Sequence, residues 1–163
     1  MAGGMRWLSV SPDPSLRASR SAVLRRLSWA AAWDMPILVN DGWEGRHPLG
    51  VPVFVVTHRA PVTWPYPDAP FTFVTDGVER AIAMALEAAD GRNVGVTAGA
   101  IASQALAMGL LDEVWVALVP VLLGGGRPFF EAWSGGPVAL DDPEVRVGRG
   151  VTHLRYRVER PGT

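Results

Sequence analysis

Three segments of this 163-residue chain place small or polar residues directly after an apolar run that predicts a β-strand. They are residues 57–59, 97–102 and 124–126. Ligands of open α/β sheets bind at the carboxyl ends of parallel strands, so these segments are the first candidates for chemistry.

Thr57, His58 and Arg59 end the first of these strands with a hydroxyl, an imidazole and a guanidinium. The planar guanidinium donates two parallel hydrogen bonds, a geometry that suits phosphate. The segment therefore predicts a phosphate site, with the 2′-phosphate of a nucleotide as a natural ligand. A solvated strand end is the alternative interpretation.

The second segment takes the chain from a strand into a helix through small residues: Thr97, Ala98, Gly99, Ala100, Ile101 and Ala102. Small side chains let a diphosphate approach the backbone, where free N–H groups and the helix dipole favour an anion. The alternative is a tight turn that needs small residues only for packing.

Gly124, Gly125 and Gly126 form the third segment, after the longest apolar run of the chain. Glycine allows positive φ angles and close approach of the backbone to a ligand. The glycines predict either a ligand-lining loop or a flexible turn.

Several kinds of chemistry are excluded by composition. The chain has no cysteine, so disulfides and thiolate sites are absent, and all 15 basic residues are arginine, which excludes Schiff-base chemistry. His47, His58 and His153 lack the spacing of metal ligands, and we expect no metal site. A net charge of −1 gives no basic field, so nucleic acid is not an expected partner.

No segment predicts a membrane span or a secretory signal. The longest apolar run, Val114–Leu123, is about half as long as a spanning helix requires. We therefore expect a cytoplasmic protein without a membrane partner.

Hydrophobic patterns predict the elements that position these segments. Strands are expected at 5–11, 35–40, 51–57, 71–75, 93–97 and 114–123, helices at 15–33, 76–89 and 99–108, and a closing hairpin at 138–147 and 151–158. The predicted fold is a single α/β domain with a mixed sheet. We expect His153 to face outward, and Asp112-Glu113 to form a solvated cap before the long strand.

Three blocks in this order resemble the C-terminal reductase domain of RibD, in the dihydrofolate reductase-like superfamily. They are VPVFVVTHRAP, the stretch from FTFVTDGVERA to VPVLLGGGRPFFE, and GVTHLRYRV. The resemblance covers about Asp41 to Val158.

This resemblance implies a three-layer fold, with a mixed, mostly parallel sheet flanked by helices and closed by a C-terminal antiparallel hairpin. It also implies a homodimer that binds NADPH and passes a hydride to a pyrimidine- or pteridine-like heterocycle. By the family pattern, Thr57, His58 and Arg59 would lie by the 2′-phosphate, and residues 97–102 would hold the diphosphate. Gly124–Gly126 would border the nicotinamide and the substrate.

The chain departs from the family pattern in its first third. Residues 1–40 are atypical, and Val39-Asn40-Asp41-Gly42 stands where the family has a Gly-Arg phosphate motif. Ala98-Gly99 replaces two glycines. Asp13, at the end of the presumed first strand, is the candidate catalytic carboxylate on the substrate side. These departures leave a second hypothesis open: a catalytically idle dimeric scaffold with weak or no nucleotide binding.

Overall fold

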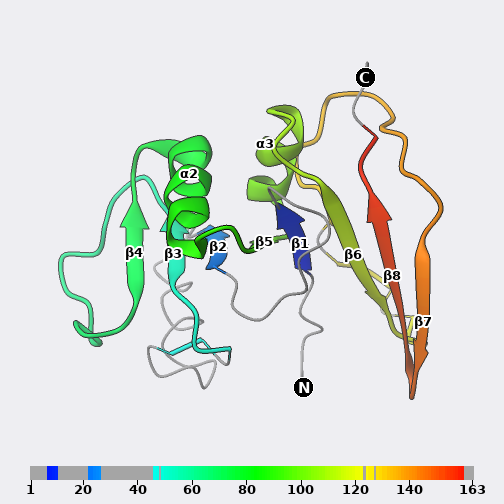
Figure 1. Ribbon diagram of the computed structural model, residues 1–163, viewed down its shortest axis with the longest axis horizontal. Coiled ribbons are helices and arrows are strands. Elements are labelled where there is room, and N and C mark those ends of the chain that lie inside the picture. The colour runs from blue at the N-terminus through cyan, green and yellow to red at the C-terminus, as the bar shows by residue number, and fades with distance from the viewer. Residues whose placement is uncertain are drawn as a thin grey trace. The chain divides into compact units, whose positions relative to one another are not determined.

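The protein folds as two compact units (Figure 1). The computed structural model describes residues 46–47, 49–122, 124–126 and 128–159, together with the backbone of Trp7–Val10 and Ala22–Arg26. One unit comprises residues 11–95 and is called the parallel unit here, and the other comprises residues 1–10 and 96–163 and is called the antiparallel unit. That the whole chain forms a single domain stays a prediction.

Three parallel strands form the sheet of the parallel unit, in the order β4-β3-β2. They are β2 (Ala22–Arg26), β3 (Val53–Val56) and β4 (Phe71–Val74). The central strand β3 is apolar throughout, and Val53, Phe54 and Val55 are buried. Continuous apolarity is typical of a strand covered on both faces, and the burial of consecutive residues of β3 agrees with this.

Helix α2 (Gly77–Ala89) packs against all three strands of this sheet. Its buried residues recur at helical spacing: Val78, Ala81, Ile82, Ala85 and Ala89. The helix ends at Asp90, which adopts the left-handed conformation with φ 50°. The predicted helix at 76–89 is confirmed.

The helix predicted for residues 15–33 is wrong where the structure describes this segment. Residues 22–26 form β2, whose Val23 and Leu24 lie opposite Val53 and Phe54 of β3. Helical propensity is a weak signal that pairing with a buried strand overrides. The strand predicted at 35–40 lies outside the described residues.

Antiparallel strands form the sheet of the other unit, in the order β1-β6-β8-β7. They are β1 (Trp7–Val10), β6 (Glu113–Leu118), β7 (Glu144–Gly148) and β8 (Val151–Arg157). The C-terminal hairpin is confirmed, and β6 is shorter than predicted. It ends two residues before Pro120, which has no N–H to continue the ladder.

Helix α3 (Ala100–Ala107) follows β5 (Val94–Thr97), the strand that crosses the boundary between the units. Ile101, Ala102 and Ala105 bury its inner face. Gly109, with φ 66°, follows the helix in the left-handed conformation that glycine commonly adopts after a helix C-terminus.

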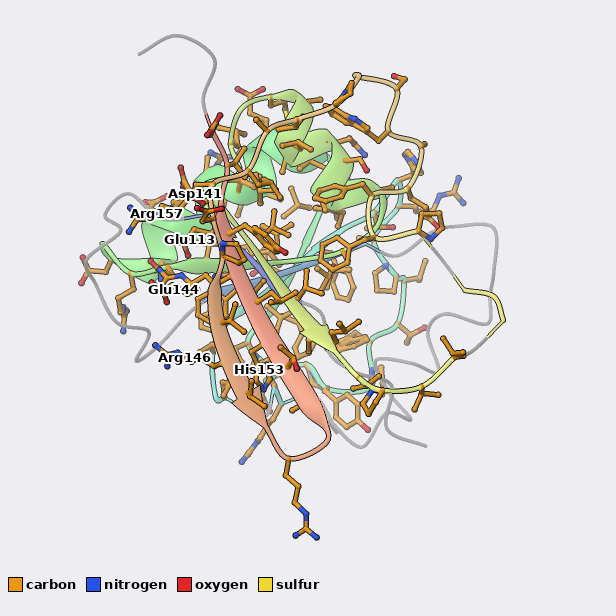
Figure 2. The ribbon with its side chains drawn as sticks, turned by 90° about the vertical axis from the view of Figure 1, so that its right-hand side faces the viewer. Glu113, Asp141, Glu144, Arg146, His153 and Arg157 are labelled. Carbon is orange, nitrogen blue, oxygen red and sulfur yellow. The ribbon has the colours of Figure 1, made fainter. Side chains whose placement is uncertain are left out.

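One face of the β6-β8-β7 sheet carries charged side chains, among them Glu113, Glu144 and Arg146 (Figure 2). The same face holds an ion pair whose carboxylate is buried. Arg155 of β8 donates to both carboxylate oxygens of Glu113, at 2.6 and 3.1 Å, and Trp115 Nε1 donates to Oε2 at 3.0 Å. The Glu113 side chain is only 4% exposed. The prediction of a solvated cap is therefore wrong for Glu113, which begins β6 and faces a cation from a strand distant in sequence.

Within the described residues, no helix combines the length and apolarity needed to cross a membrane.

Candidate functional site

The end of β3 forms a turn that the Thr57 hydroxyl holds together. Thr57 is buried, and its Oγ1 donates to the carbonyl of Arg59 at 3.0 Å and accepts from the Arg59 N–H at 3.4 Å. The Thr57 N–H continues the sheet by donating to the carbonyl of Val74 at 3.0 Å. The hydroxyl is thus engaged in shaping the turn, which leaves the exposed side chains of His58 and Arg59 as the groups that could reach a ligand.

The neighbouring strand β4 ends at the same edge because β3 and β4 are parallel. Thr75 Oγ1 donates to the Asp76 carboxylate at 3.3 Å, and Gly77, with φ 92°, opens α2. Thr75 and Asp76 were not among the predicted site residues. The signal was a second strand that runs out into polar residues, directly before a helix.

The turn between β5 and α3 depends on a glycine. Gly99 has φ 105° and ψ −148°, a region essentially restricted to glycine, and it precedes the first residue of the helix. The N–H groups of the first helical turn have no partner within a helix, and here they belong to Ala100, Ile101 and Ala102. Since Ile101 and Ala102 bury their side chains, only their backbone could bind a ligand.

The segment after the three glycines returns to this turn. The Gly99 N–H donates to the carbonyl of Phe129 at 2.8 Å. A carboxylate oxygen of Glu131 lies 3.7 Å from the position that a Cβ on Gly99 would occupy. The structure thus brings the segment that follows the glycine run, and not the glycines themselves, to the turn at Gly99. It also adds Glu131, which was not among the predicted site residues although it follows the glycine run closely.

The triple glycine is exposed and open. A Cβ built on Gly124, Gly125 or Gly126 would meet no atom within 4 Å, and Gly124 has φ 68°. The positive φ explains why glycine is needed at position 124, and the open surroundings of all three leave room for a ligand beside the backbone.

The predicted site residues belong to different units of the chain. Thr57, His58 and Arg59 belong to the parallel unit, and the turn at Gly99 belongs to the antiparallel unit. Asp13 lies outside the described residues. Among the described residues, no group of three histidines or carboxylates could hold a metal ion.

Solved structures share this fold. A protein assigned to riboflavin biosynthesis from Shewanella sp. PV-4 is 20% identical, with a TM-score of 0.66 over 92% of this chain and 85% of that chain. A diaminohydroxyphosphoribosylaminopyrimidine deaminase/5-amino-6-(5-phosphoribosylamino)uracil reductase from Thermotoga maritima is 16% identical, with a TM-score of 0.52. That match covers 85% of this chain and 45% of the Thermotoga chain. The predicted mixed α/β, dihydrofolate reductase-like fold is therefore confirmed.

A search of curated proteins found no match. The family model of the RibD C-terminal domain matches residues 32–147, which is more than half of the chain and includes all three candidate segments. The protein therefore belongs to the RibD C-terminal domain family.

Proposed function

We propose that the protein is an NADPH-dependent reductase that transfers a hydride to a pyrimidine- or pteridine-like heterocycle. The observation that carries the proposal is the start of α3. Gly99 holds a conformation that a side chain would strain, and the first-turn N–H groups follow it directly. Backbone N–H groups and the positive end of the helix dipole form a fitting site for the cofactor diphosphate.

The exposed turn at the end of β3 fits the other phosphate of this cofactor. The Thr57 hydroxyl bonds to the backbone of Arg59 and so holds the turn in one conformation. The backbone that carries His58 and Arg59 is therefore ordered before a ligand binds. A guanidinium on a preformed turn can donate a bidentate pair of hydrogen bonds to a 2′-phosphate. NADH lacks this phosphate, and the proposal therefore favours NADPH over NADH.

The substrate class is supported by the similarity to the Thermotoga protein, whose name includes a uracil reductase. Bound NADPH would supply the hydride, while the protein would supply binding and orientation. The open backbone at Gly124–Gly126 would lie against the nicotinamide and the heterocycle. Asp13 remains the proposed substrate-side carboxylate.

The test is a titration of the purified protein with NADPH and, separately, with NADH, followed by quenching of tryptophan fluorescence. We expect saturable binding that favours NADPH. A protein that binds neither dinucleotide would contradict the proposal and favour the idle scaffold, whereas equal affinities would contradict the assignment of the 2′-phosphate site.

We also propose that the protein is a homodimer, joined through the apolar face of the β6-β8-β7 sheet. The register of the three strands places five apolar residues on the same face of the sheet: Val116, Leu118, Leu154, Val145 and Val147. Val114, at the start of β6, is buried, but Leu118 is 60% and Val147 is 82% exposed. An exposed apolar patch of this kind is typical of an interface.

The dimer can be tested by sedimentation of two variants with charge changes on opposite faces of β7. Val147→Glu is expected to produce monomers, because it places a carboxylate in the proposed interface. Arg146→Glu, on the other face of the same strand, is expected to remain dimeric. A wild-type protein that sediments as a monomer at high micromolar concentration would contradict the proposal.

A further inference from the structure

The carboxylate of Glu131 lies beside Gly99, the residue directly before α3. Its Oε2 is 3.7 Å from the Cβ position of Gly99, and the segment that carries it is fixed by the hydrogen bond from the Gly99 N–H to the carbonyl of Phe129. Glu131 is half-buried, so bulk water screens its charge less than that of a fully exposed residue.

A negatively charged Glu131 at this position would repel a second anion bound at the N-terminus of α3. The N-terminus of a helix carries about half a positive charge, which a nearby carboxylate already offsets in part. A diphosphate at the same helix end would face the Glu131 carboxylate as well as the N–H groups. Two negative charges at one helix end repel each other, and the cost increases as water is excluded.

We propose that Glu131 sets the affinity of this turn for a diphosphate: its charge weakens the binding of the cofactor. The inference rests on the proposed function, since it concerns the same turn. It identifies an affinity-determining residue that acts through its charge and not through contact with the reacting atoms. If Glu131 instead accepted a hydrogen bond from a ribose hydroxyl, removing its charge would weaken binding, so the two roles predict opposite signs.

The experiment compares the wild type with Glu131→Gln, which removes the charge and preserves the shape. The dissociation constants of NADPH and of inorganic pyrophosphate are measured by fluorescence quenching and calorimetry. Measurements at about 0.01 M and about 1 M salt change the Debye length from about 30 Å to about 3 Å. We expect Glu131→Gln to bind both ligands about tenfold more tightly at low salt, with the difference largely lost at high salt.

Glu159→Gln is the matched control, because it makes the same charge change at an exposed position of the same unit. It is expected to leave both dissociation constants unchanged. A cooperative thermal unfolding transition verifies that each variant is folded. If Glu131→Gln does not fold, Glu131→Ala is used in its place.

The outcomes separate the inference from the proposed function. If Glu131→Gln binds the ligands more tightly than the wild type, the inference is supported. This includes the case in which only the variant binds measurably. Wild-type binding that the substitution leaves unchanged or weakens overturns the inference and leaves the proposed function intact. Absence of binding by the wild type and by both Glu131 variants overturns the inference and the proposed function together.

Discussion

Replacing Arg155 by alanine is expected to lower the free energy of unfolding by about 3 kcal/mol. The substitution removes two hydrogen bonds from Glu113, whose side chain is almost fully buried. The remaining donor is Trp115 Nε1, at 3.0 Å from Oε2. A buried carboxylate that loses its cation retains the cost of desolvation without the compensating attraction. The Arg155 side chain is 28% exposed, so water can partly replace it, which places the expected effect at the lower end of the usual range.

Urea denaturation measures this effect, and Arg146→Ala is its control. Arg146 lies on the same face of the sheet, but its side chain is 81% exposed, and it approaches Glu144 only to 4.0 Å. Its loss is expected to change the free energy of unfolding by less than about 0.5 kcal/mol. Equal stability of the Arg155 and Arg146 variants would show that the buried pair contributes nothing specific.

The ion pair is also expected to be insensitive to alkaline pH. Hydrogen bonds to Glu113 raise the pKa of the Arg155 guanidinium above its ordinary value, and this exceeds the opposing effect of its partial burial. A group with a raised pKa stabilises the fold at every pH below its unfolded value and loses this contribution only above it. The difference between wild type and Arg155→Ala should therefore stay constant from neutral pH to about pH 10.

The sequence predicts those parts of the fold that depend on residues close together in the chain, and it fails for Glu113. Helix α2 was predicted closely because its apolar spacing and the Asp90-Gly91 stop lie within one local segment. The alternation of β8 correctly placed His153 on the exposed side. Glu113 was assigned to solvent, because its partner Arg155 lies 42 residues away and only the register of β6 and β8 brings them together.

The candidate site shows the same division between local and distant information. Strand ends and glycines are local signals, and the predicted turns lie where β3 and β5 end. The hydrogen bond from the Thr57 hydroxyl to Arg59 is also local, since it spans two residues, but it was not predicted. Glu131 was missed because its approach to Gly99 requires the segment after the glycine run to fold back on the helix.

Replacing Arg59 by alanine is expected to weaken NADPH binding by about 10- to 100-fold and to leave NADH binding unchanged. The range corresponds to the loss of a charge-assisted hydrogen-bond pair to the 2′-phosphate. NADH has no such phosphate, so its dissociation constant reports whether the rest of the site is intact. Arg59→Lys should retain part of the affinity, because lysine keeps the charge but loses the planar fork.

Arg149→Ala provides the matched control for this substitution. Arg149 is exposed in the turn between β7 and β8, so its removal makes the same change in net charge in the other unit of the chain. If both arginine variants weaken NADPH binding equally, the effect is one of overall charge, and Arg59 does not contact the phosphate. A loss confined to Arg59→Ala and to NADPH assigns the 2′-phosphate to the turn that Thr57 holds, because charge and fold are the same in the control.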